Sequence, residues 1–123
     1  MNGTKNILLT IITENQTQKT KAKKFAELIK KELDQNWKIL SIEKYSKLEH
    51  SYKIELKKLH GEMSHEELKL KQLNIAFKLV SPWLLFYDET QNTLELIYYK
   101  KEESQFRKNE FNVFNWCQIQ AVI

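Results

Sequence analysis

The stretch that decides the fold is Trp83-Leu84-Leu85-Phe86-Tyr87, followed by a polar turn over residues 88–92 and by Thr93-Leu94-Glu95-Leu96-Ile97-Tyr98-Tyr99. The first run is apolar and aromatic and ends at a polar turn, which is typical of a β-strand. In the second run Leu94, Leu96 and Tyr98 share one face, as the two-residue period of a strand requires. The two runs therefore predict a β-hairpin.

A third strand is predicted further along the same block. The chain is polar from Lys101 to Glu110 and then resumes aromatic spacing at Phe111, Phe114 and Trp116. A small sheet of this kind needs a hydrophobic layer over one face before it is stable in water. We therefore expect the upstream part of the chain to supply that layer.

Two amphipathic helices are predicted upstream. The first follows Lys19, with Thr17 or Thr20 as the candidate N-cap, and its apolar positions are spaced by three and four residues: Ala22, Phe25, Ala26, Ile29 and Leu33. The second begins at a capping box formed by Ser64 and Glu67 and ends at Ser81-Pro82. Its predicted apolar stripe is Leu70, Leu73, Ala76, Phe77 and Val80.

Three further strands complete the predicted order of elements. Residues 7–13 are apolar on both faces, which suits a central strand, and residues 36–45 form a second strand. Residues 51–59 alternate, with Lys53, Glu55 and Lys57 on a face exposed to water. The order predicts an α+β fold with a ferredoxin-like βαββαβ core, two additional C-terminal antiparallel strands, and both helices packed on one face of the sheet.

The composition is that of a single globular domain spanning residues 1–123. Hydrophobic residues make up 41% of the chain and charged residues 29%, and there is no linker or low-complexity tract. No apolar run approaches the roughly 18 residues of a membrane-spanning helix, so no membrane partner is expected. Because Cys117 is the only cysteine, an intracellular reducing compartment is the expected setting, with Cys117 as a strand residue and not a nucleophile.

The charge pattern argues against a nucleic-acid partner. The net charge is +4, but Arg107 is the only arginine among 20 basic residues. Bidentate phosphate and base recognition favours arginine. The water-exposed face of residues 51–59 also carries lysine and glutamate where an RNA-binding sheet would present stacking aromatics.

No residue pattern predicts an enzyme, a metal site or a cofactor. The only concentration of metal-capable groups is His60, Glu62, His65, Glu66 and Glu67. Gly61 and the Ser64 cap separate the two histidines, so they do not form a helical i, i+4 pair, and a turn is the preferred interpretation. No G-x-S-x-G or related nucleophile motif occurs.

The C-terminal block, from Ser81-Pro82-Trp83 through the hairpin and on to Ser104-Gln105-Phe106-Arg107 and Glu110-Phe111-Asn112-Val113-Phe114-Asn115-Trp116, resembles small bacterial immunity proteins. These are the immunity proteins of contact-dependent growth inhibition systems. The resemblance covers about the last third of the chain. It implies a cytoplasmic protein that binds the C-terminal domain of a cognate toxin, often a nuclease, and blocks its active site.

A set of partner-binding residues follows from this resemblance. The hairpin and the loop after it carry five carboxylates that could form an acidic patch and three aromatic residues that could anchor a partner. The predicted set is Asp88, Glu89, Glu95, Tyr98, Tyr99, Glu102, Glu103 and Phe106. A solvated sheet edge is the alternative interpretation of the carboxylates, and a small RNA-binding module or a scaffold subunit is the alternative function.

Overall fold

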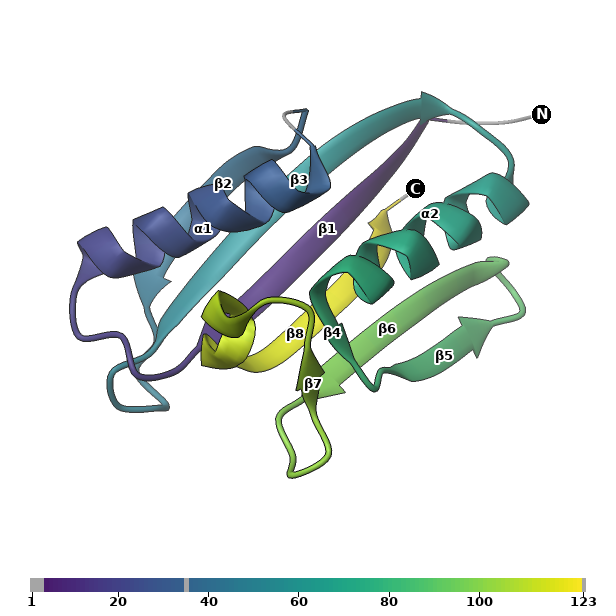
Figure 1. Cartoon of the computed structure of the whole chain (residues 1–123). Coiled ribbons are helices and arrows are strands. Elements are labelled where there is room, and N and C mark those ends of the chain that lie inside the picture. The colour runs from purple at the N-terminus through teal and green to yellow at the C-terminus, as the bar shows by residue number, and fades with distance from the viewer. Residues whose placement is uncertain (1–3, 35, 123) are drawn as a thin grey trace.

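The protein has an α+β fold, with two helices and a six-stranded sheet whose pairs are all antiparallel (Figure 1). The computed structural model describes residues 4–34 and 36–122, apart from the side chains of Thr4 and His60. The helices are α1 (Lys19–Leu33) and α2 (His65–Leu79). The sheet contains β1 (Thr4–Thr13), β2 (Lys38–Lys44), β3 (Tyr52–Glu62), β5 (Leu84–Asp88), β6 (Thr93–Tyr99) and β8 (Phe114–Val122).

Three short elements complete the fold. Two two-residue strands, β4 (Val80–Ser81) and β7 (Gln105–Phe106), pair with each other outside the main sheet. A 3-10 helix, η1 (Asn109–Val113), leads into β8. The predicted third strand of the C-terminal block therefore begins at Phe114, and Phe111 belongs to the turn before it.

The order of strands across the sheet is β2-β3-β1-β8-β6-β5. The predicted β5–β6 hairpin is confirmed, with Leu85 opposite Leu96. A ferredoxin-like order is not confirmed, because β5, the strand that follows α2 and the short strand β4, lies at the far edge of the sheet. The last strand, β8, lies beside β1 instead, where it buries Phe114, Cys117 and Ile119 completely.

Both helices cover the same face of the sheet, as predicted (Figure 1). The buried residues of α1 are the predicted stripe of Ala22, Phe25, Ala26, Ile29 and Leu33. Phe25 packs edge-on against Phe111 and Phe114, with ring centroids 6.2 and 5.2 Å away. These aromatic contacts tie the first helix to the C-terminal block of the chain.

The predicted apolar stripe of α2 is right at Ala76 and Val80, which are buried, and at Leu73, which is partly buried, but it is wrong at Leu70 and Phe77. The helix buries Leu68, Gln72, Ile75, Ala76 and Leu79. Leu70 and Phe77, which the prediction placed in the core, are 61% and 58% exposed. Because α2 is apolar around much of its circumference, its spacing fits two stripes. The stripe with Leu68 faces the sheet and the stripe with Leu70 does not.

Candidate functional site

The face of the sheet opposite the helices, hereafter the open face, carries a hollow of about 520 Å³. Residues directly opposite each other in antiparallel pairs point to the same side, so the register defines rows of side chains on this face. Three rows cross the central strands from β3 to β6: Lys53–Ile12–Trp116–Tyr99, Glu55–Thr10–Gln118–Ile97 and Lys57–Leu8–Gln120–Glu95.

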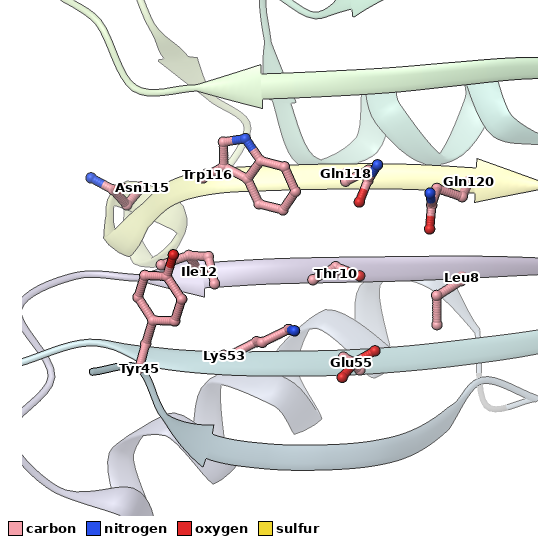
Figure 2. A pocket seen from close by; sticks show the side chains of 10 residues that line it. All are labelled: Leu8, Thr10, Ile12, Tyr45, Lys53, Glu55, Asn115, Trp116, Gln118 and Gln120. Atoms are coloured by element: carbon pink, nitrogen blue, oxygen red, sulfur yellow. The ribbon is translucent and has the colours of Figure 1, made fainter. Parts of the chain in front are cut away.

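Figure 2 shows the side chains that line the hollow, and they come from three neighbouring strands and the loop after β2. The lining residues are Leu8, Thr10, Ile12, Tyr45, Lys53, Glu55, Asn115, Trp116, Gln118 and Gln120. A volume of this size lies within the usual range for ligand sites. The hollow is open to solvent along the sheet, so it suits a protruding part of a larger partner.

One end of the hollow is aromatic. The rings of Tyr45 and Trp116 lie there, with Ile12 between them (Figure 2). Tyr45 is held in place by its backbone N–H, which donates to the carbonyl of Ser51 at 2.9 Å. Ile12 is only 6% exposed although no helix covers this face, so neighbouring side chains enclose it. This end offers an apolar floor with two aromatic walls.

The middle and the far end of the open face carry polar side chains that are held by hydrogen bonds. The Nε2 atoms of Gln118 and Gln120 both donate to Glu95 Oε2, at 3.1 and 3.4 Å. On the other side of the hollow, Ser41 Oγ donates to Glu55 Oε1 at 3.3 Å. Side chains fixed in this way lose less conformational entropy when a partner binds.

The predicted acidic patch is divided between two ends of the hairpin. Asp88 and Glu89 lie at the turn between β5 and β6, whereas Glu102 and Glu103 lie in the loop after β6. All four are exposed. The seven residues of β6 separate the two pairs by roughly 20 Å at the rise of a strand. Glu95 lies between them on the open face, so the five carboxylates do not form one surface.

Tyr98 is not the exposed anchor that the sequence predicted. It lies on the same face of β6 as Leu96, the face that the helices cover, and it is completely buried. Its hydroxyl donates to Ser104 Oγ at 2.9 Å, and its ring centroid lies 5.8 Å from that of Trp83. Burial raises the pKa of the Tyr98 hydroxyl above its ordinary value. Tyr98 therefore stabilises the fold and cannot contact a partner.

The other two predicted anchors are accessible but lie apart from each other. Tyr99 is 46% exposed on the open face, directly opposite Trp116, and Lys101 Nζ lies 4.5 Å from its ring centroid. Phe106 is partly buried in β7, with Lys100 Nζ 5.8 Å from its ring. Of the predicted set, only Glu95 and Tyr99 belong to the open face beside the hollow.

Trp116, Gln118 and Gln120 are not among the site residues that the sequence predicts. The signal was present, since these three alternate with the buried Cys117 and Ile119, which is the pattern of a strand with one polar face. Tyr45 carried no such signal. It follows the last residue of β2, and only the folded chain brings it beside Trp116.

The metal-capable residues near the start of α2 do not converge. Among the described side chains, no three His, Cys, Asp or Glu residues lie close enough together to hold a metal ion. His65 Nδ1 lies 3.1 Å from the backbone oxygen of Asn92, and the side chain of His60 lies outside the described part of the structure. Within residues 4–34 and 36–122, no helix has both the length and the apolar character needed to cross a membrane.

Comparisons with known proteins identify no related protein. No protein-family model, curated protein or solved structure matches the chain at a significant level.

Proposed function

We propose that this protein is a binding protein that receives a protein partner on its open face, and that it is an immunity protein whose partner is the C-terminal domain of a cognate toxin. The observation that carries the binding proposal is the hollow with its aromatic end. The partner class comes from the resemblance of the C-terminal block to immunity proteins of contact-dependent growth inhibition systems.

The composition of the open face supports a protein–protein contact. Aromatic side chains contribute much of the energy of such interfaces, and Trp116, Tyr99 and Tyr45 lie on or beside the same surface. Amides and charges of both signs surround them, as in the polar rim of an interface. The hollow would take a protruding side chain or loop of the toxin, and the surrounding sheet would cover the toxin's active site.

Co-expression tests this proposal. The open reading frame immediately upstream, as the candidate toxin, is expressed in a susceptible bacterium with the wild-type protein or with Trp116→Ala, and growth is measured. We expect rescue by the wild type and a loss of rescue with Trp116→Ala, because truncating a buried interface aromatic commonly costs about 2 kcal/mol or more, roughly 30-fold in affinity.

Lys23→Ala is the control, since Lys23 is an exposed residue of α1, on the other side of the sheet and outside both the open face and the β5 edge of the sheet. It should rescue growth like the wild type. Circular dichroism confirms that both variants are folded. A wild-type protein that neither rescues growth nor binds the purified toxin domain would refute the immunity function, and full rescue by Trp116→Ala would refute the open face as the site.

One observation favours a second candidate function, the binding of single-stranded nucleic acid on the open face. Trp116 and Tyr99 are cross-strand neighbours on the open face, and Lys53 and Lys57 lie on the same face. Such an arrangement stacks bases on aromatic rings beside a positive charge. Fluorescence anisotropy with labelled oligonucleotides decides between the two, because nucleic-acid binding would weaken steeply with salt and an immunity protein would show none.

A further inference from the structure

The β5 edge of the sheet is uncovered. All five residues of β5 are exposed, and the apolar side chains Leu84, Leu85, Phe86 and Tyr87 have exposed fractions between 41% and 54%. Figure 1 shows β5 at the outer edge, and no described element pairs with its free side. An edge strand of this kind presents unpaired backbone N–H and C=O groups that can pair with another strand.

The opposite edge of the sheet, β2, is protected. Lys38, Glu43 and Lys44 place charges at both ends of β2, and its register with β3 shifts between Ile39 and Ser41. Charges and bulges are the usual means by which a sheet edge is kept from pairing with another chain. β5 has neither device, since it pairs with β6 without a register shift and its only charge is the terminal Asp88.

The exposed stripe of α2 continues the uncovered surface. Lys69 Nζ lies 5.0 Å from the ring centroid of Tyr87, so the side of α2 that carries Lys69 and the partly buried Leu73 faces β5. Leu70 and Phe77 flank Leu73 at a spacing of three and four residues and are exposed. We define the β5 surface as Leu84, Leu85, Phe86 and Tyr87 of β5 with Leu70 and Phe77 of α2.

We propose that two copies of this chain pair through β5 as a symmetric antiparallel dimer with one continuous sheet. With a two-fold axis perpendicular to the sheet, the helix faces of both copies lie on one side and the open faces on the other. An odd-numbered residue of β5 can therefore pair only with an odd-numbered residue, and an even-numbered one only with an even-numbered one. Of the registers that remain, the one centred on Phe86 forms the most pairs. It sets Phe86 against Phe86, and Leu85 against Tyr87 of the second copy.

The chemistry of β5 fits this register. Leu85 and Tyr87 point to the helix face, because they lie opposite Leu96 and Leu94, and Phe86 points to the open face opposite Glu95. Aromatic pairs and aromatic–aliphatic pairs across strands are favourable. The two Asp88 carboxylates fall at opposite ends of the new ribbon, so no like charges stand opposite each other.

The area is sufficient for a specific contact. At roughly 200 Å² for a large apolar side chain, the six half-exposed side chains of the β5 surface present on the order of 600 Å² per copy. A symmetric pair that covered all of it would bury on the order of 1,200 Å², an upper bound that reaches the lower end of the range for specific interfaces. The β5 surface therefore fits a second copy of this chain.

Opposed charges at position 86 test the dimer by sedimentation equilibrium. The wild type should have twice the 14.8 kDa mass of one chain. Phe86→Lys and Phe86→Glu should each be monomeric, because like charges would stand directly opposite each other. An equimolar mixture of the two should regain the dimer mass, which also shows that both variants fold. Leu40→Lys places the same charge on an exposed leucine of β2 and should remain dimeric.

Cysteine substitution tests the register. Opposite Cα atoms lie about 4.5–5.5 Å apart, within disulfide range, so Phe86→Cys should cross-link under oxidising conditions. Leu84→Cys should not, because the two copies of residue 84 would lie about 14 Å apart along the ribbon. Cys117 is buried and leaves the background low.

A monomeric wild type, a dimer unaffected by Phe86→Lys, or open-ended aggregates would refute the dimer. A monomer would leave β5 to a strand of another protein. Phe86 is not among the residues that line the hollow. The dimer does not depend on the proposed function, so either can fail alone.

Discussion

Cys117 shows how the position of one side chain in β8 fixes its chemistry. It lies on the helix face between Ile11 of β1 and Tyr98 of β6, and it is completely buried. Burial raises the pKa of the Cys117 thiol well above its ordinary value. A thiol that resists ionisation is a poor nucleophile, so the residue acts as a small hydrophobic side chain in the core.

This raised pKa makes the stability of the protein sensitive to alkaline pH. Above the ordinary thiol pKa of about 8.5, the unfolded chain loses a proton that the folded protein keeps, so the free energy of unfolding falls as pH rises. The contribution of Cys117 should reach about 1.4 kcal/mol per pH unit. Urea unfolding at a series of pH values measures it. Cys117→Ala should show a shallower decline, and identical slopes would contradict the prediction.

The sequence predicted single residues best where a repeating pattern was read along one strand or helix. The water-exposed face of β3 at Lys53, Glu55 and Lys57 was predicted correctly from alternation. The abundance of aromatic residues in interfaces favours Tyr98 as an anchor, but its alternation with Leu96 indicates the core, where the structure places it. Tyr45 was out of reach, because its role depends on a contact between segments far apart in the chain.

At the scale of elements, the two helices begin with different caps. Ser64 at the N-cap of α2 accepts a hydrogen bond from the Glu67 backbone N–H at 3.1 Å, as the capping box predicted. The N-cap of α1 is Gln18, not the predicted Thr17 or Thr20, and it makes no side-chain cap bond. The backbone of Gln18 is in the β region, which is the conformation that a capping serine requires.

Opposite effects are therefore expected at the two caps. Ser64→Ala should lower the free energy of unfolding by about 1 kcal/mol, and Gln18→Ser should raise it by a similar amount. Urea unfolding measures both, with Gln18→Ala as the control that should change little. A stable Ser64→Ala variant together with an unchanged Gln18→Ser would show that neither cap contributes.

The elements themselves were largely predictable, but their arrangement was not. Local patterns predicted the stripe of α1, the hairpin and the helix boundary at Ser64. Two questions needed the whole fold. One was which of two apolar stripes on α2 faces the sheet, and the other was whether β5 or β8 lies beside β1. Both depend on competition between distant segments for the same buried position, and no local period records that competition.

At the scale of the whole molecule, the two proposed contact regions are separate. The hollow lies over β3, β1 and β8, and the β5 surface lies at the edge of the sheet and on α2. Pairing through β5 would leave both hollows open and facing the same side. A dimer could therefore hold two partner molecules at once.

Dimerisation should make stability depend on protein concentration. When folding and association are coupled, raising the concentration favours the folded dimer by mass action. The urea midpoint of the wild type should rise with protein concentration, whereas that of Phe86→Lys should not. Urea unfolding followed by circular dichroism over a roughly hundredfold range of protein concentration checks this. A wild-type midpoint that does not depend on concentration would contradict it.

The contrast between the two sheet edges has a consequence for how far assembly can proceed. Once two β5 strands have joined, both outer margins of the extended sheet are β2 strands, whose charges and shifted register resist a further strand. Assembly stops at the dimer, because the protein has one sheet edge that can pair with another strand and one that cannot. A chain in which both sheet edges could pair would polymerise into fibres, so the bulge in β2 also limits assembly to two copies.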